Sequence, residues 1–194
     1  MTALIDLAIY GTPCGGTQFL SQALRAAGID VGHEKLGPQG FVCGWAGFRL
    51  RKIDPDDALP LHSWRLLRDP RKTLETLPGY SHRTDTAGNE QAWMHSDVVV
   101  SALRWWVLLH ERYRHLPSIR LASLDKDWPA LVRPILGSVP PITSAEQNSK
   151  KRRWPLMTWE DLILLDPEYA PRARDIWNTD STDASLHESS ENRE

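Results

Sequence analysis

The sequence has few cysteines and little net charge. Its 194 residues include two cysteines, Cys14 and Cys43, and 23 Lys+Arg against 25 Asp+Glu give a formal net charge of −2. Two cysteines do not fit the disulfide framework typical of small secreted proteins, and no His/Cys cluster has a zinc-type spacing. At this length roughly 70% of the unfolded chain's surface can be buried, so we expect a hydrophobic core without disulfide or metal.

Long hydrophobic runs are also missing. No stretch approaches the ~20 apolar residues that span a bilayer, so we expect no membrane span. The first eleven residues hold a short apolar run, but it contains Asp6, no basic segment precedes it and no signal-peptidase-like site follows. We therefore expect a strand there, and a cytoplasmic protein.

Composition divides the chain into two parts. Residues 178–194 contain five acids, one base and little to bury, which predicts an acidic disordered tail. The tail carries a net charge of −4, which leaves +2 on residues 1–177, the expected single domain. This excess is too small to indicate nucleic acid as a partner, but it suits a compact anionic ligand.

Strand-like and helix-like segments alternate along residues 1–177. The expected strands are Leu4–Tyr10, Ile29–Val31, Leu61–Leu67 and Ile119–Ala122. The expected helices are Gln18–Ala27, Arg71–Leu77, Gln91–Tyr113, one from Asp127 to about Leu136, Leu162–Leu165 behind a capping box at Thr158–Asp161, and one that starts at Asp166-Pro167. A long mobile loop is expected over Lys35–Asp57. This order predicts a three-layer α/β domain with a short, mostly parallel sheet of about four strands flanked by helices.

A glycine-rich loop follows the first expected strand. Gly11-Thr12-Pro13-Cys14-Gly15-Gly16 has the G-x-x-x-x-G spacing of a phosphate-binding loop and precedes a helix. Consecutive N–H groups at a helix start form an anion site, although the spacing alone also fits a tight turn. Thr17-Gln18 replaces the Lys-Ser/Thr pair of nucleoside-triphosphate P-loops, which disfavours ATP or GTP hydrolysis.

In this context the chain resembles the P-loop-like sulfotransferases of small bacterial type, which use 3′-phosphoadenosine 5′-phosphosulfate (PAPS). Pro13-Cys14-Gly15-Gly16-Thr17 is similar to the family's P-[K/R]-[S/G]-G-T loop, which cradles the 5′-phosphosulfate. Arg68, followed eight positions later by Thr76, is similar to the family's Arg/Ser pair for the 3′-phosphate. Weaker similarities at Ala27–Glu34 and from Asn148 to Leu162 extend the resemblance in pieces over about residues 4–165.

The resemblance implies a P-loop-like fold, PAPS as cofactor, PAP as product and no required metal. It implies cofactor binding by Thr12, Pro13, Cys14, Gly15, Gly16, Thr17, Gln18, Arg68, Thr76, Lys151, Arg152 and Arg153. Glu34 matches the position of the family's catalytic Glu, and His33 is the alternative base because its ordinary pKa suits proton transfer. The plainer interpretations are a surface salt bridge for Arg68, a polar strand end for His33 and Glu34, and a solvated basic face or a nucleic-acid contact for the run near Arg153.

The implied acceptor is a hydroxyl on a sugar or small metabolite. Trp45, Phe48 and Trp93 are candidates to line its site, although nine tryptophans in one chain mainly indicate a core. Neither the acceptor's identity nor the oligomeric state follows from the sequence.

Cys14 is the main departure from the family, which has a Lys or Arg at this position. Losing such a charge-stabilising donor costs roughly 3–4 kcal/mol of barrier. Arg65, Arg71 or the basic run Lys150–Arg153 are candidates to replace the charge. The alternatives are a slow enzyme or a PAP/PAPS-binding protein without transfer; a nucleotide kinase is disfavoured because the P-loop lysine is absent.

Overall fold

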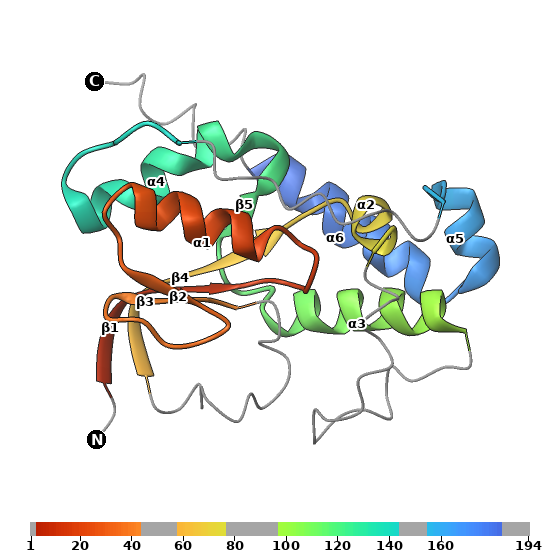
Figure 1. The fold of residues 1–194 in the computed structure, drawn as a ribbon. Helices are drawn as coiled ribbons and strands as arrows, with labels where there is room; N and C mark the ends of the chain where they lie inside the picture. Colours follow the sequence, from red (N-terminus) through yellow and green to blue (C-terminus); the bar gives the residue numbers. More distant parts are fainter. Residues whose placement is uncertain (1–2, 44–57, 77–96, 144–154, 184–194) are drawn as a thin grey trace.

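The structure is a computed structural model, and it describes residues 3–43, 58–76, 97–143 and 155–183 (Figure 1). The strands are β1 (Ala3–Tyr10), β2 (Val31–His33), β3 (Gly40–Cys43), β4 (Ala58–Leu67) and β5 (Ser118–Arg120). The helices are α1 (Thr17–Ala26), α2 (Pro70–Leu74), α3 (Val98–Arg112), the 3-10 turn η4 (Leu121–Ser123), α4 (Leu124–Leu136), α5 (Trp159–Leu165) and α6 (Tyr169–Asp183).

The five strands form one parallel sheet in the order β2-β3-β1-β4-β5. The central strand β1 pairs with β3 on one side, where Leu7 is opposite Gly40, and with β4 on the other, where Tyr10 is opposite Arg65. The expected α/β class with a parallel sheet is confirmed. The sheet has one strand more than the sequence indicated.

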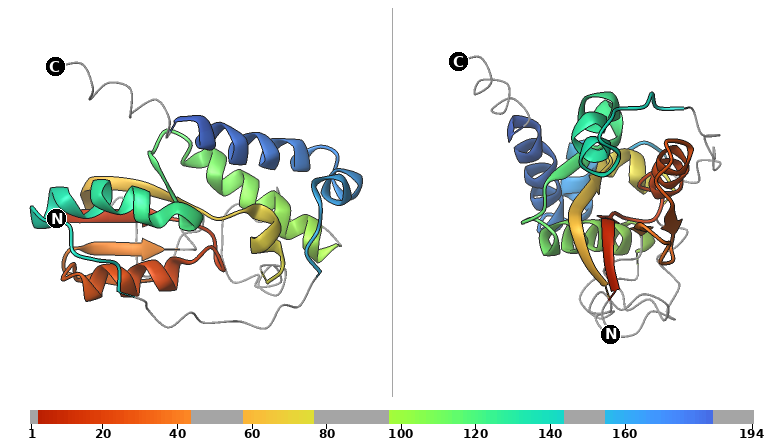
Figure 2. Two further views of the ribbon diagram at one scale, coloured as in Figure 1. Left: turned by 90° about the horizontal axis from the view of Figure 1, so that it is seen from above. Right: turned by 90° about the vertical axis from the view of Figure 1, so that its left-hand side faces the viewer.

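Helices cover both faces of the sheet, as the side-chain alternation of a strand requires. Leu7 and Ile9 of β1 belong to the core cluster that α1 and α4 complete, whereas Ala8 and Tyr10 belong to the cluster formed with α3, α5 and α6. Figure 1 shows α1 and α4 above the sheet with α3 below it, and Figure 2 shows the same layers from two other sides. The expected three layers are confirmed.

The long loop expected over Lys35–Asp57 is wrong for its first part, which contains β3. Residues 34–39 connect β2 to β3, although parallel strands usually need a connection of about a dozen residues. Glycines permit this tight return: a Cβ on Gly37 would lie 2.4 Å from the nitrogen of Gly32, and Gly40 has φ +137°. Because the short apolar run lies among glycines, the sequence pattern resembled a loop. Residues 44–57 lie outside the described residues.

Most expected helix signals are found in place. Gly28 follows α1 with φ +96°, and Thr158 and Asp161 form the expected capping box. The Asp166 carboxylate accepts the N–H groups of Glu168 and Tyr169 just before and at the start of α6. These residues act through local hydrogen bonds, which a sequence pattern encodes well.

Some helix boundaries differ from expectation, and the helix expected over Arg71–Leu77 ends at Leu74. The helix expected to start at Asp127 begins at Leu124, and the Asp127 carboxylate instead accepts the N–H of Arg120 at 2.8 Å; burial raises the pKa of this carboxyl. The last helix, α6, continues to Asp183, inside the stretch expected to be a tail, because Ala173 and Ile176 anchor it in the core. In the part of the chain described here, no helix has the length and apolar character needed to cross a membrane.

Candidate functional site

The candidate residues gather at the carboxyl ends of the strands. The glycine-rich loop follows β1, Glu34 follows β2, Cys43 ends β3 and Arg68 follows β4. From β1 the chain moves towards β2 and β3, whereas from β4 it moves towards β5, so the direction reverses between β1 and β4. In open parallel sheets, ligands bind in the crevice at such a reversal.

The loop is held in a defined conformation. The Gly15 N–H donates to the Thr12 carbonyl and the Gly11 N–H donates to the Cys43 carbonyl, each at 2.9 Å. Gly16 has φ +95°, and a Cβ there would lie 2.4 Å from a methyl of Leu121. Cys14 is one of the non-glycine residues with positive φ, at +61°. Such backbone conformations tend to persist where a loop is shaped for a ligand.

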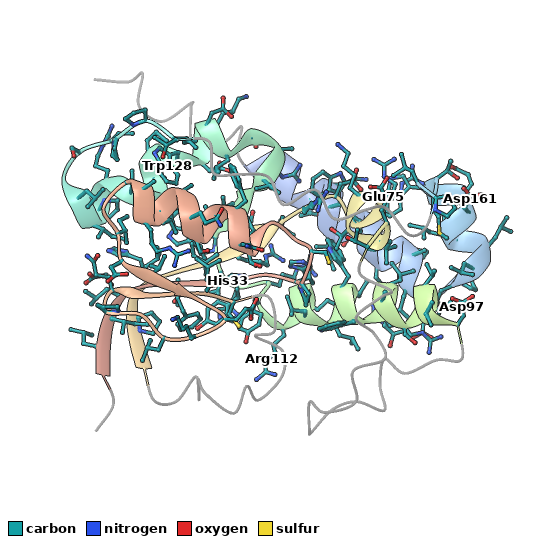
Figure 3. The ribbon with its side chains drawn as sticks, viewed as in Figure 1. His33, Glu75, Asp97, Arg112, Trp128 and Asp161 are labelled. Carbon is teal, nitrogen blue, oxygen red and sulfur yellow. The ribbon has the colours of Figure 1, made fainter. Side chains whose placement is uncertain are left out.

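The N-terminus of α1 has the character of an anion site. Within the described residues, no side chain caps this end and its first turn carries no acid. By contrast, Asp69, Asp97 and Thr158 cap α2, α3 and α5; Asp97 is labelled in Figure 3 at the start of α3. The first N–H groups of a helix lack intrahelical partners and carry partial positive charge, so this end of α1 suits a negatively charged group.

Arg68 lies against this loop. Its Nη1 donates to the Cys14 carbonyl at 2.6 Å, so the corner after β4 and the loop after β1 are in contact across 54 residues of sequence. The Thr76 hydroxyl donates instead to the Thr73 carbonyl at 3.4 Å, within its own helix end. The structure thus places Arg68 at the loop and shows Thr76 bonded only locally.

The two base candidates lie beside the first residue of α1. The Thr17 hydroxyl oxygen is 3.2 Å from His33 Nε2, and the same nitrogen is 3.5 Å from Glu34 Oε1. The side chains of His33 and Glu34 are 29% and 25% exposed, which leaves both accessible to a ligand. Figure 3 labels His33 at the end of β2, below α1. A ligand bound at Thr17 would therefore have a proton acceptor next to it.

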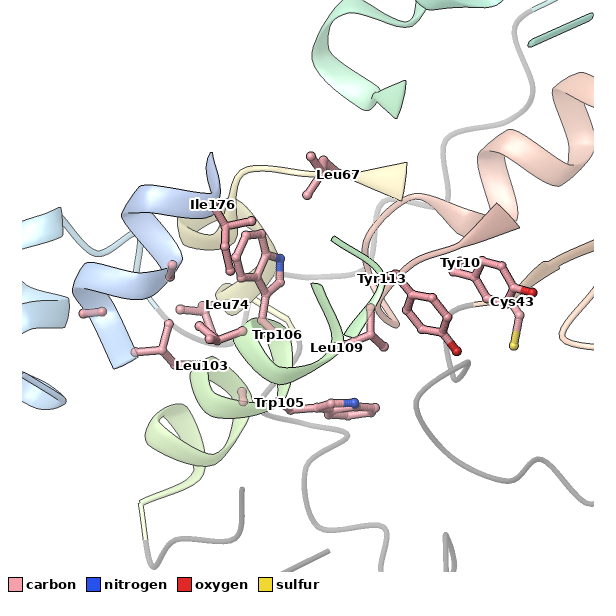
Figure 4. Close-up of a cluster of buried hydrophobic side chains, with 14 of the residues drawn as sticks. Tyr10, Cys43, Leu67, Leu74, Leu103, Trp105, Trp106, Leu109, Tyr113 and Ile176 are labelled. Atoms are coloured by element: carbon pink, nitrogen blue, oxygen red, sulfur yellow. The ribbon is translucent and has the colours of Figure 1, made fainter. Parts of the chain in front are cut away.

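Cys43 is a part of the site that the sequence did not indicate. Its thiol donates to Glu34 Oε2 at 3.2 Å, and its side chain is buried beside Tyr10 (Figure 4). Tyr10 stacks on Tyr113 with ring centroids 4.4 Å apart, and burial raises the pKa of Tyr10 to about 12. Cys43 thus links Glu34 to the buried aromatic cluster. Recognition of β3 in the sequence would have placed Cys43 at a strand end.

Leu121, at the start of η4, is a second residue that the sequence analysis missed. Its side chain lies where a Cβ on Gly16 would be, so it packs directly against the loop. The residue follows β5 in the chain, and the edge of the sheet brings it to the loop. No local sequence signal reports such a contact between distant segments.

The candidates for replacing the missing charge at Cys14 are placed differently. Arg65 is buried, and its Nη1 donates to the carbonyl of His110 in α3 at 3.0 Å. Arg71 makes two hydrogen bonds with the Asp69 carboxylate and lies over the Trp159 ring, 5.3 Å from its centroid. Arg65 is thus held against α3, and Arg71 against Asp69 and α5. Arg68, by contrast, contacts the loop at the Cys14 carbonyl, and the parts of Arg65 and Arg71 stay predictions.

Several expected site residues lie outside the described residues. They are Lys150, Lys151, Arg152 and Arg153 of the basic run and the aromatic residues Trp45, Phe48 and Trp93. Their parts in the site stay predictions.

The described site combines uncapped helix N–H groups, one guanidinium and a His/Glu pair, which suits an anionic ligand and a proton transfer. Among the described residues, no group of three or more His, Cys, Asp and Glu side chains is placed to hold a metal ion. No protein-family model, curated protein or solved structure matches the chain.

Proposed function

We propose that this protein is a PAPS-dependent sulfotransferase with a P-loop-like fold, which moves a sulfuryl group to a hydroxyl of a sugar or small metabolite. The observation that carries the proposal is the 2.6 Å bond between Arg68 Nη1 and the Cys14 carbonyl. PAPS has one charged group at each end of its ribose, so its site needs two anion-binding corners within the length of one nucleotide. The loop and Arg68 supply two such corners in contact with each other.

The 5′-phosphosulfate would lie at the start of α1. The N–H groups of Gly16 and Thr17 would donate to its oxygens, and the Thr17 hydroxyl would add a further bond. The Gly15 N–H would join them by exchanging its bond to the Thr12 carbonyl for one to the ligand. Uncapped helix N–H groups and the absence of an acid in the first turn of α1 support this assignment.

The 3′-phosphate would lie at the start of α2. Remaining N–H groups of the Arg68 guanidinium would donate to it, and Thr76, just past the end of α2, is the second candidate ligand. Thr76 would have to exchange its long bond to the Thr73 carbonyl for one to the phosphate. The run Lys151–Arg153 is the further candidate to cover this end.

Transfer needs one bond to form and one to break at sulfur. The acceptor oxygen would attack the sulfur in line, the bond from sulfur to the phosphate oxygen would break, and PAP would leave with that electron pair. The acceptor's proton would pass to Glu34 or His33, which lie within 3.5 Å of each other beside Thr17. Positioning and charge neutralisation supply most of the rate in reactions of this kind.

A second function, PAP/PAPS binding without transfer, is favoured by one observation. Residue 14 is a half-buried cysteine, so its side chain brings no positive charge to the leaving-group oxygen. Incubation with radiolabelled PAPS and panels of glycans and phenols separates the two functions. The enzyme transfers label to an acceptor and releases PAP in equal amount. Tight PAP binding with no label transferred to any acceptor would favour the binding protein.

A further inference from the structure

We infer that Arg68 supplies the positive charge that Cys14 does not, and thus acts on the 5′ group of the nucleotide as well as on the 3′-phosphate. This inference rests on the proposed function. It adds that one guanidinium serves both ends of the ligand, so that a nucleotide with a 5′-phosphate alone also depends on Arg68.

The contact with Cys14 is the first support. The donor–acceptor distance of 2.6 Å places the Arg68 guanidinium directly against the backbone of residue 14, the position whose side chain lacks a charge. A guanidinium carries five N–H groups, and this bond uses one of them. Arg68 is half-buried, so its field is screened less than that of a fully exposed side chain.

Other described cations near the end of β4 make contacts elsewhere. Arg120, opposite Leu67 in β5, donates to the Trp177 carbonyl. Arg65 donates to the carbonyl of His110 in α3, and Arg71 forms an ion pair with Asp69. Lys72 is exposed on α2. Arg68 donates a hydrogen bond to the loop itself, at the Cys14 carbonyl.

Two ligands separate the possible roles of Arg68. PAP carries a 3′-phosphate and a 5′-phosphate, whereas AMP carries the 5′-phosphate alone. An arginine that serves only the 3′-phosphate affects PAP and not AMP. An arginine that also provides positive charge at the loop affects the binding of both AMP and PAP.

The test is calorimetry of AMP and PAP with the wild type, Arg68→Ala and Lys72→Ala. We expect Arg68→Ala to lower the affinity for AMP about tenfold or more, and the affinity for PAP by at least as much. Lys72→Ala removes the same charge from the same corner without touching the loop, and both affinities should stay within about twofold. Unchanged AMP affinity in Arg68→Ala, or a wild type that binds PAP but not measurably AMP, would overturn the inference. A wild type that binds neither nucleotide would instead contradict the proposed function itself.

Rescue distinguishes charge from packing. In the Arg68→Ala background, Cys14→Lys should restore AMP affinity to within about threefold of wild type, because the charge returns to residue 14. Cys14→Met adds a side chain of similar length without charge and should not. Equal rescue by both would show that Arg68 acts by filling space. Should Arg68→Ala fail to fold, Arg68→Gln is the substitute, because it keeps an N–H donor without the charge. Arg68→Gln should still lower the affinity for AMP about tenfold, and unchanged AMP affinity would overturn the inference.

Discussion

Single side chains at the strand ends determine what this protein can do. His33 lies within hydrogen-bonding distance of Thr17 and within ion-pair distance of Glu34, although 16 residues separate Thr17 from His33. The spacing of the glycine loop and the position of Glu34 were readable in the sequence. Their contact was not, because it depends on the pairing of β2 with β3.

Replacing the base should reduce transfer without abolishing cofactor binding. If Glu34 takes the acceptor's proton, Glu34→Gln should lower the transfer rate about 10²–10⁴-fold, because an amide cannot accept that proton. His33→Ala should give the larger loss if the imidazole is the base. Transfer of label from PAPS, with PAP affinity as control, measures both. Full turnover in both single variants would show that neither residue is the base.

His110 should make stability depend on pH. It is fully buried, and neither ring nitrogen has a hydrogen-bond partner in the described residues; burial and the charge of Arg65 hold its pKa well below 6.5. Below pH 6.5 the unfolded chain therefore binds a proton that the folded protein does not, so stability falls as the pH falls, by up to about 1.4 kcal/mol per pH unit.

Denaturant unfolding between pH 5 and pH 8 tests this effect of His110. His110→Phe removes the titrating group and keeps a ring beside Trp106. Below pH 6.5 the slope of the unfolding free energy against pH should therefore be smaller than in the wild type, by the amount that corresponds to about one proton. His115→Gln, at an exposed position, serves as the control and should leave the slope of the unfolding free energy against pH unchanged. An unchanged slope in His110→Phe would contradict the assignment.

At the scale of elements, the loop between β1 and α1 depends on glycine for two separate reasons. Gly16 and Gly28 have nearly the same φ, +95° and +96°, but a Cβ would meet Leu121 only at Gly16 and nothing within 4 Å at Gly28. Substituting Gly28 therefore tests backbone strain alone, whereas substituting Gly16 tests strain together with the steric contact with Leu121.

Gly16→Ala should destabilise the protein by about 2–4 kcal/mol and weaken PAP binding, because both strain and the contact with Leu121 oppose it. Gly28→Ala should cost about 1 kcal/mol and leave PAP affinity unchanged. Urea unfolding and calorimetry measure the two effects. Adding Leu121→Ala to Gly16→Ala should recover part of the loss, and equal effects of the two glycine substitutions would contradict the packing described.

Elements defined by local chemistry could be predicted, and those defined by distant contacts could not. The capping box at Thr158 and the glycine after α1 act within one helix turn, so the sequence contains their signal. Strand β3 is four residues long and depends on its pairing with β1 and β2 for its existence. Asp127 has the composition of a cap but serves β5 and η4 through the N–H of Arg120, a role that only the packed structure defines.

At the scale of the whole molecule, the sheet order creates the site. Because β1 and β4 are adjacent and their connections leave in opposite directions, the glycine loop and Arg68 are in contact at the point where ligands bind in open parallel sheets. The sequence predicted these two corners separately, through the resemblance of their motifs. Their distance depends on the register of β1 with β4, in which Tyr10 is opposite Arg65.

Calorimetry with PAP, ATP and GTP on the wild-type protein tests the central claim most directly. If the proposed function holds, the protein should bind PAP with a submicromolar dissociation constant, and it should give no heat with ATP or GTP because the P-loop lysine is absent. Binding of ATP or GTP with no binding of PAP would contradict the account.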